Sequence, residues 1–317
     1  MTTATALLFP GQGSQESGMG RDVAESDRSA MDLWKKAERI SGLELRAIYW
    51  EGDAAAMADT RALQPALTVV NLTLWSLLSR KFTPACTAGH SLGEYSSLAA
   101  ANVLSADAVI ELTALRGRLM AEADPEGKGT MAAILKLSLA DAENALTSAR
   151  EASGEMLGIA NYNTPGQFVA SGTKAAIAAL QESVKQYKGR AIPLPVSGAF
   201  HSPLMQEAAA EMAKALEKSS WNTAKFPVYP NVTGKAVTDT RELKQFLLEQ
   251  MTSSVCWIDT IANQWNNGVR RFVECGPKGV LTKMTKPILD AIENAPAPEH
   301  YSVCAVGTME AAEGFQD

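Results

Sequence analysis

The residues best suited to covalent chemistry in this sequence surround Ser91, within the pentapeptide Gly-His-Ser-Leu-Gly at positions 89–93. A glycine-x-serine-x-glycine pattern between a strand and a helix is typical of a tight turn that projects the serine hydroxyl into a cleft. The N-terminus of the following helix would supply free backbone N–H groups and a positive dipole end, which can stabilise an oxyanion. The alternative is a turn that carries an incidental serine. We predict that Ser91 is a nucleophile.

A serine hydroxyl needs a nearby base, and the sequence contains three histidines, His90, His201 and His300. His90 adjoins Ser91 and cannot easily turn back onto its hydroxyl, so we expect it to pack beneath the turn. His300 lies in a C-terminal segment rich in proline, alanine and charge, which we expect to be poorly ordered. Elimination leaves His201 as the candidate base. The competing interpretation is a surface histidine on a loop.

Five motifs give the chain a family resemblance. It resembles the malonyl-CoA:acyl carrier protein transacylases of bacterial fatty acid synthesis and the acyltransferase domains of polyketide synthases. The resemblance extends from about residue 5 to about residue 290 and leaves the C-terminal tail outside. The motifs occur in this order: LLFPGQGSQ at 7–15, GHSLGEYSSLAA at 89–100, RGRLM at 116–120, GAFHSPLM at 198–205 and ECGPKGVL at 274–281.

The resemblance implies a ping-pong reaction on a malonyl-serine intermediate. The malonyl group would pass from malonyl-CoA to Ser91 and then to the phosphopantetheine thiol of an acyl carrier protein, without a metal or another cofactor. It implies that His201 is the base and that the backbone carbonyl of Gln250 orients it. The backbone N–H groups of Gln12 and Leu92 would form the oxyanion hole.

The resemblance also implies which residues recognise the substrate. Arg116 would bind the free carboxylate of the malonyl group, because a guanidinium offers a planar, permanently charged fork. Arg118, two residues away on the same expected helix, faces elsewhere and is expected to be solvated. Asn161 matches a position near the family's active site. Phe200 resembles the residue of malonyl-selective members, whereas methylmalonyl-selective relatives carry a smaller one.

The elements that must position these residues follow from the apolar pattern. We expect a buried strand at 4–9, a helix at 65–80 with Pro65 in its first turn, a strand at 85–88 and a helix at about 105–123. Residues 129–194 have the order β-α-β-β-α-β, which predicts a ferredoxin-like unit. The predicted fold class is α/β. It comprises a large α/β-hydrolase-like domain with a parallel sheet (1–128 and 195–292), the ferredoxin-like subdomain inserted at 129–194, and a tail at 293–317.

Composition narrows the partners and the compartment. The net charge of −6 gives no general attraction to nucleic acid or to anionic membranes. The four cysteines lack C-x-x-C spacing, which argues against structural zinc and fits a reducing cytoplasm. We expect no signal peptide and no membrane span, and a monomer. An acidic carrier protein would need local basic residues. The candidates are Lys278, Lys283 and Lys286 beside the ECGP motif, and Lys188 and Arg190 at the end of the inserted unit.

Two alternatives of different classes stand beside the transferase. Serine, histidine and an oxyanion hole would equally suit a thioesterase that clears acyl chains from carrier proteins, although a hydrolase of simple acyl groups has no use for Arg116. A non-catalytic subunit of a larger synthase need not retain Ser91, His201, Gln12 and Arg116 together.

Overall fold

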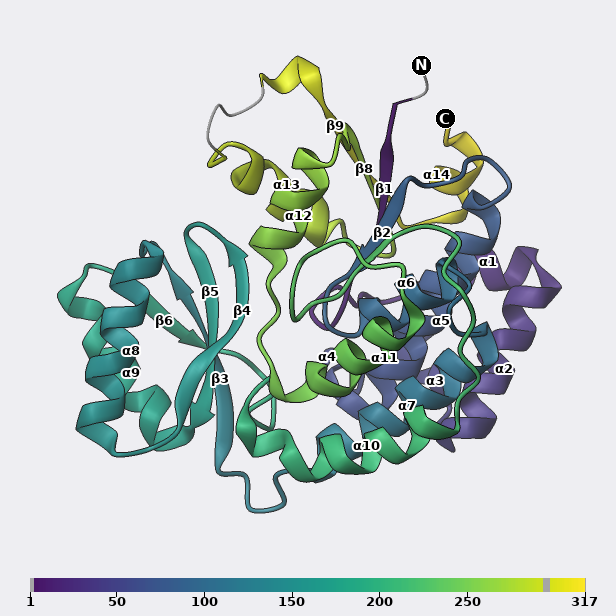
Figure 1. Cartoon of the computed structure of the whole chain (residues 1–317). Coiled ribbons are helices and arrows are strands. Elements are labelled where there is room, and N and C mark those ends of the chain that lie inside the picture. The colour runs from purple at the N-terminus through teal and green to yellow at the C-terminus, as the bar shows by residue number, and fades with distance from the viewer. Residues whose placement is uncertain (1–2, 293–296, 317) are drawn as a thin grey trace.

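The computed structural model describes residues 3–292 and 297–316, and their strands form two separate sheets (Figure 1). The larger sheet has five parallel strands in the order β7-β2-β1-β8-β9. Its strands are β1 (Thr5–Phe9), β2 (Cys86–Gly89), β7 (Val228–Tyr229), β8 (Arg271–Cys275) and β9 (Ser302–Val306).

The centre of this sheet positions the site. Every residue of β1 is buried, because helices cover both faces of a parallel sheet and its strands become continuously apolar. β1 pairs with β2 so that Phe9 lies opposite Gly89. The loop after β1, at 10–15, and the turn after β2, at 90–92, therefore emerge side by side at the carboxyl edge. This edge is where open α/β sheets bind ligands.

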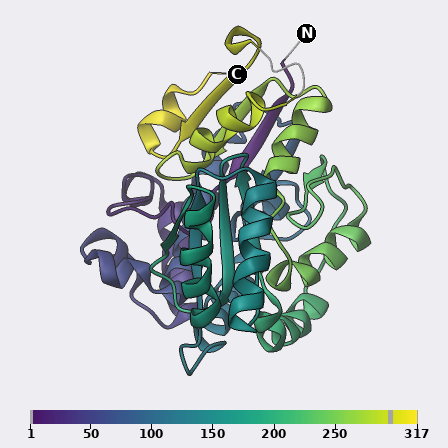
Figure 2. The ribbon, with the colours of Figure 1, turned by 90° about the vertical axis from the view of Figure 1, so that its left-hand side faces the viewer.

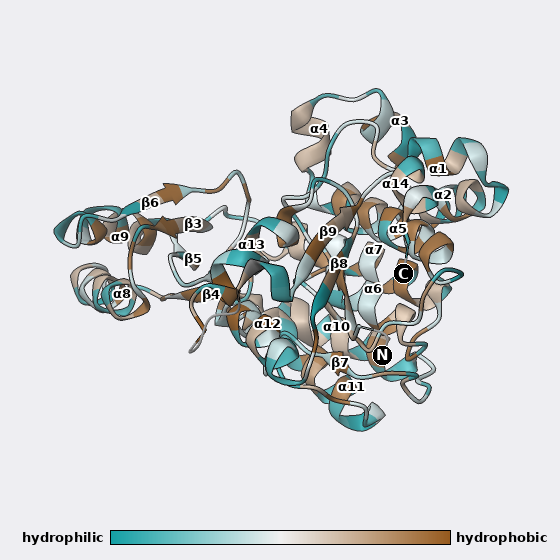
Figure 3. Cartoon of the chain, turned by 90° about the horizontal axis from the view of Figure 1, so that it is seen from above, coloured by the Kyte–Doolittle hydropathy of each residue, from teal (hydrophilic) through white to brown (hydrophobic). Residues whose placement is uncertain are grey.

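Most helices of the larger unit pack around this sheet. The helix α5 is buried along most of its length and is largely brown in Figure 3, whereas the outer helices α1 and α2 are largely teal. The helices before the second sheet are α1 (Arg21–Ser26), α2 (Arg28–Ser41), α3 (Leu45–Trp50), α4 (Ala54–Ala58), α5 (Thr60–Leu78), α6 (Gly93–Ala100) and α7 (Ala106–Glu122). Those after it are η1 (Pro203–Met205), α10 (Gln206–Lys218), α11 (Thr240–Glu249), η2 (Gln250–Thr252), α12 (Trp257–Asn266), α13 (Val280–Leu289), η3 (Pro298–His300) and α14 (Met309–Gly314).

The expected start of α5 was wrong. The helix begins at Thr60, where the Asp59 side chain accepts a hydrogen bond from the Arg61 N–H, and Pro65 lies inside the helix. Proline removes one backbone donor, which ordinarily disfavours an interior position. Burial of the nearby residues Leu63 and Ala66 in the main core outweighs this local cost.

The second sheet comprises β3 (Gly129–Leu135), β4 (Leu157–Thr164), β5 (Gln167–Thr173) and β6 (Arg190–Pro193), all antiparallel, in the order β4-β5-β3-β6. The helices α8 (Leu139–Ser153) and α9 (Lys174–Gln186) lie next to each other over one face, as Figure 2 shows. This strand order with two helices on one face is the ferredoxin-like arrangement. The predicted fold class, α/β with a parallel sheet and a smaller βαββαβ unit, is confirmed.

A seam of hydrogen bonds joins β4 to the segment that follows η2. The Val255 N–H donates to the Ala160 carbonyl (2.8 Å), and the Tyr162 N–H donates to the Val255 carbonyl (2.9 Å). The Ser254 hydroxyl donates to the Ile159 carbonyl (2.5 Å). The second sheet is therefore attached to the larger unit by strand-like pairing as well as by the chain crossings at its two ends.

The expectation of a poorly ordered C-terminal tail was also wrong. Residues 293–296 of that segment lie outside the described residues, but β9 pairs in parallel with β8 over five residues and completes the larger sheet. The apolar residues of SVCAV explain the strand, and proline-rich composition upstream obscured it. Within the described ranges, none of the helices has the length and apolar character that crossing a bilayer requires.

Candidate active site

Ser91 occupies a strained turn between β2 and α6. Its φ of 50° lies in the left-handed region that non-glycine residues rarely adopt. The flanking glycines are required by close packing. A Cβ atom on Gly93 would lie 2.0 Å from the Phe9 carbonyl oxygen, and one on Gly89 would lie 1.9 Å from the Gly93 carbonyl carbon. The glycines at 89 and 93 thus let the turn sit directly against β1.

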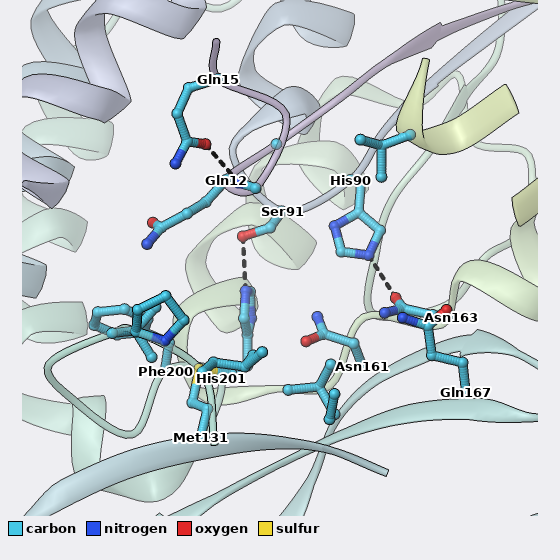
Figure 4. Close-up of a pocket in the computed structure, with 18 of the residues that line it drawn as sticks. Gln12, Gln15, His90, Ser91, Met131, Asn161, Asn163, Gln167, Phe200 and His201 are labelled. Carbon is cyan, nitrogen blue, oxygen red and sulfur yellow. Dashed lines mark hydrogen bonds between the residues drawn. The ribbon is translucent and has the colours of Figure 1, made fainter. Parts of the chain in front are cut away.

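The Ser91 hydroxyl and the His201 imidazole form a hydrogen-bonded pair, with Oγ 2.7 Å from Nε2 (Figure 4). The other ring nitrogen, Nδ1, faces two carbonyl oxygens, those of Gln250 (3.0 Å) and Ser253 (3.1 Å). Carbonyls only accept, so the network assigns the proton to Nδ1 and leaves Nε2 free to accept from Ser91. This is the tautomer that a general base needs.

Burial also keeps His201 neutral. His201 is 7% exposed, and desolvation, with the positive charge of Arg116 as a second cause, lowers the pKa of His201 to about 3. His201 has a φ of 55°, so His201 and Ser91 both have strained backbone. Such strain persists only where the surrounding structure enforces it, and it concentrates at functional sites.

Arg116 reaches the same hydroxyl from α7. Its side chain is 1% exposed, and Nη2 lies 3.2 Å from Ser91 Oγ and 3.2 Å from Gln250 Oε1. Nη1 donates to Gln64 Oε1 at 2.5 Å. Close packing of α7 on α5 makes this possible, since a Cβ atom on Gly117 would lie 2.8 Å from the Thr60 carbonyl oxygen.

The charge on Arg116 has no anionic partner in contact. Across residues 3–292 and 297–316, none of the described ion pairs includes this guanidinium, and its Nε–H is buried without an acceptor. Arg118, by contrast, is exposed, as expected. The buried Glu94 carboxyl acts on this charge only from a distance, and burying a charge without a contacting counter-ion is costly unless the site receives one. The arrangement places a guanidinium that could bind an anion beside the Ser91 hydroxyl.

The loop after β1 lies against the serine turn. A Cβ atom on Gly11 would approach the His90 carbonyl oxygen to 2.3 Å and the Leu92 backbone nitrogen to 3.5 Å. Gln12 is the next residue, and Figure 4 shows it beside Ser91. The structure therefore brings together the two residues, Gln12 and Leu92, whose N–H groups were expected to face the substrate oxygen.

A pocket of about 320 Å³ opens onto Ser91. Phe200 and Asn161 line it together with Ser91 and His201 (Figure 4). Phe200 also packs beside Arg116, with Met120, His201, Met205 and Met251, around a gap too small to hold a water molecule. Towards α13 the lining becomes apolar, with Val280, Leu281 and Met284. The pocket thus has a polar end at the serine and an apolar wall.

His90 lines this pocket as well, which the sequence did not indicate. Its Nε2 lies 2.8 Å from Asn163 Oδ1, and its ring packs edge-on against Trp257, with the ring centroids 5.4 Å apart. The expected packing role accounts for the Trp257 contact, but not for the exposure of His90 to the pocket. His300 is exposed in η3.

Several residues that hold the site were missed by sequence reasoning. They are Gln64, Glu94, Asn163, Asn231 and the carbonyl of Ser253. Asn231 follows the two-residue strand β7, whose carboxyl end abuts that of β2. A position just after a parallel strand was the available signal, but so short a strand is not visible in the sequence pattern.

Residues 6–312 match the family described as Acyl transferase domain, a class that the hydrogen-bonded serine–histidine pair suits. The chain is 39% identical to a malonyl CoA-acyl carrier protein transacylase of Bacillus subtilis over 285 residues, covering 89% of this chain and 90% of the relative. It is 37% identical to the Haemophilus influenzae protein of that name, covering 98% of each. The chain belongs to the malonyl CoA-acyl carrier protein transacylase family.

Comparison with solved structures supports the same family. FabD from Acinetobacter baumannii superposes with a TM-score of 0.89 at 34% identity, covering 99% of this chain and 97% of that one. A malonyl-transacylase in complex with a type II PKS acyl-carrier protein superposes with a TM-score of 0.89 at 33% identity, covering 98% of each chain. The family match reaches residue 312, so β9, which was expected to lie outside the family resemblance, falls inside it.

Proposed function

We propose that this enzyme transfers the malonyl group of malonyl-CoA to the phosphopantetheine thiol of an acyl carrier protein. In the first half-reaction, Ser91 Oγ attacks the thioester carbonyl carbon while His201 Nε2 takes the hydroxyl proton. The backbone N–H groups of Gln12 and Leu92 stabilise the oxyanion. The carbon–sulfur bond then breaks, the coenzyme A sulfur takes the proton from His201, and a malonyl ester remains on Ser91.

The second half-reaction runs the same steps with another thiol. His201 accepts the proton of the phosphopantetheine thiol, and the sulfur attacks the ester carbonyl carbon. The ester bond to Ser91 Oγ breaks, and His201 returns the proton to that oxygen. No metal or further cofactor enters these steps, because each proton moves between a sulfur or oxygen atom and the same imidazole.

The observation that carries the malonyl assignment is the buried, unpaired guanidinium of Arg116 in contact with Ser91 Oγ. A malonyl thioester brings its carboxylate two bonds from the carbonyl carbon that Ser91 attacks, so the carboxylate and the guanidinium meet. A thioesterase for simple acyl groups would gain nothing from this charge. For selectivity we propose Phe200, a bulky side chain that lines the pocket and also packs beside Arg116, as Met120 does.

For the carrier protein we propose docking at Lys278 and Lys283. Both are exposed, and Lys278 Nζ lies 3.3 Å from the carbonyl oxygen of Gly13, a residue of the pocket lining. Lys283 precedes Met284, another lining residue. Lys286 is already paired with Asp290 at 2.9 Å. Lys188 and Arg190 are exposed at the start of β6. We also propose that the enzyme acts as a cytoplasmic monomer.

Intact-mass analysis tests the function directly. Malonyl-CoA alone should add one malonyl group, mapped to the peptide that contains Ser91, and holo carrier protein should then remove it. Ser91→Ala should show no adduct, and an adduct that persists in this variant would contradict the nucleophile assignment. The ratio of malonyl-carrier protein to free malonate separates the transferase from the thioesterase. Predominant malonate release with carrier protein present would favour the hydrolase.

A further inference from the structure

Two side-chain amides hold the backbone of the nucleophile from opposite sides. Asn231 Oδ1 accepts a hydrogen bond from the Ser91 N–H at 2.7 Å, and Asn231 Nδ2 donates to the Gly89 carbonyl at 2.6 Å. Gln250 Nε2 donates to the Ser91 carbonyl at 2.9 Å. Because Ser91 has a left-handed backbone, these contacts are what keeps its hydroxyl aimed at His201.

Both holding residues converge on a single atom, Oε2 of Glu94. The Asn231 backbone N–H donates to it at 3.1 Å and Gln250 Nε2 donates to it at 2.8 Å. Glu94 lies in the first turn of α6 and is 1% exposed, although a glutamate at that position of a helix is ordinarily solvated. A buried carboxylate is kept only where its hydrogen bonds are satisfied.

The carboxylate also decides which way the Gln250 amide points. Nε2 faces two acceptors, the Ser91 carbonyl and Glu94 Oε2, so Oε1 must face the Nη2 donor of Arg116 at 3.2 Å. The reversed amide would place its NH₂ group against the guanidinium and its oxygen against two acceptors. Gln250 thereby links Glu94 to the guanidinium, and its backbone carbonyl separately orients His201.

We propose that Glu94 is a positioning residue for acyl transfer. By accepting hydrogen bonds from Asn231 and Gln250 on one oxygen, it holds the strained nucleophile turn and orients the Gln250 amide towards Arg116. Glu94 acts through these two residues and does not touch the acyl group. The inference rests on the proposed function, since it explains how the nucleophile and the anion-binding guanidinium keep their relative positions.

A double-mutant cycle between Glu94 and Gln250 tests the proposal. Glu94→Met removes the acceptor at similar volume, and Gln250→Met removes the amide but keeps the backbone carbonyl that orients His201. Each is expected to slow malonylation of Ser91 by about tenfold or more, the effect of losing hydrogen bonds to a charged group. The readout is the single-turnover rate at saturating malonyl-CoA, beside the concentration for half-maximal rate.

Coupling between the two sites is the deciding result. If Glu94 acts through Gln250, the double variant should be little slower than the slower single variant, because the second change removes a contact already lost. Rate losses that multiply, or a wild-type rate in Gln250→Met, would overturn the action of Glu94 through Gln250 and leave only its contact with Asn231. The latter outcome can be read even if Glu94→Met does not fold.

A conservative variant and a matched control complete the experiment. Glu94→Gln keeps an oxygen that can accept from both donors, so it should restore most of the rate lost in Glu94→Met. An equal loss of rate in both variants would show that Glu94 does not contribute by accepting hydrogen bonds.

Glu274 provides the matched control. It is also buried and accepts from Thr282 near the start of α13. Glu274→Met should lower the melting temperature and leave the rate of the folded protein near wild type. A wild-type protein that is never malonylated would contradict the proposed function and not this inference.

Discussion

The Nη2 atom of Arg116 stands one hydrogen bond, 3.2 Å, from the Oγ atom of Ser91. A malonyl ester on that oxygen would carry its carboxylate back towards the guanidinium. Losing a charge-assisted, two-pronged contact costs at least about 1.5–3 kcal/mol. Arg116→Ala should therefore slow malonyl transfer by roughly tenfold to a hundredfold. Acetyl transfer should be unchanged or faster, and Arg116→Lys should recover little. The measurement compares the rates of malonyl and acetyl transfer in the wild type and both variants. If both rates fall together, Arg116 is a structural residue.

The pH dependence of acylation should reflect the depressed pKa of His201. The base must be neutral to accept the serine proton, so the rate stays constant above this pKa and falls as pH drops through it. Burial and Arg116 lower the pKa of His201 to about 3, so the falling limb should lie well below the ordinary value near 6.5. Burial raises the pKa of Glu94 to about 7, so the profile is best recorded in Glu94→Gln.

The contribution of Arg116 to that profile can be isolated. Arg116→Met removes the positive charge that disfavours protonation of His201, so the acid limb should move to higher pH. Acetyl-CoA is the suitable substrate, because the variant is expected to use malonyl-CoA poorly. An unshifted limb would show that burial alone sets the pKa of His201.

Phe200 should govern tolerance for a branched acyl group. Phe200 is 4% exposed, lines the pocket at Ser91 and packs beside Arg116. A methyl group in a tight pocket changes discrimination by about 1–3 kcal/mol. Phe200→Ser should raise methylmalonyl transfer relative to malonyl transfer, whereas Phe200→Leu, which keeps the bulk, should change the ratio much less. A competition assay between methylmalonyl-CoA and malonyl-CoA measures this ratio. An unaltered ratio in Phe200→Ser would place selectivity elsewhere.

The contact between the loop after β1 and the serine turn can be tested at Gly11. A methyl group there would lie 2.3 Å from the His90 carbonyl oxygen, so Gly11→Ala should push the loop away from Leu92. We expect a lower melting temperature and a larger loss in acylation rate than in substrate binding. Gly166→Ala is the control, since its added atom meets nothing within 4 Å and its backbone needs no positive φ. Equal behaviour of the two variants would contradict this role of the loop.

Docking of the carrier protein can be separated from thioester binding by charge reversal. Lys283→Glu should raise the Michaelis constant for carrier protein more than that for malonyl-CoA, because carrier proteins are acidic and the charge faces them. Lys188→Glu makes the same change of charge on the second unit. A larger effect at Lys188 would move the docking surface to the second sheet.

Local patterns predicted the parts of the site that are contiguous in sequence. The turn around Ser91 has its glycines within two residues. His201, Arg116 and Phe200 were predicted because each lies in a motif that carries the family resemblance. Pro65 shows where local reasoning fails, because burial of α5 outweighs the usual cost of proline inside a helix. β9 shows where reasoning from composition fails, since pairing with β8 orders a segment that was expected to be poorly ordered.

The supporting contacts could not be predicted because they join distant residues. Asn231 bonds to Ser91 across 140 positions and Gln250 to Glu94 across 156. An asparagine or glutamine in a sequence does not indicate which residue it will bond to, since both residue types are common on surfaces. Glu94 adjoins the serine motif, but at the start of a helix its charge is explained by the helix dipole alone. Only the fold reveals that it is buried.

The seam between β4 and residues 254–255 bears on how acyl groups are sorted. Enzymes that select substrates by closing over them need a hinge with few hydrogen bonds across it. Here Asn161 sits on a strand bonded through its backbone to the segment just after Gln250, whose carbonyl orients His201. Backbone hydrogen bonds thus join the wall of the pocket to the segment that supports His201. The enzyme should behave as a template of constant dimensions, whose tolerance is changed by trimming side chains and not by loosening a hinge.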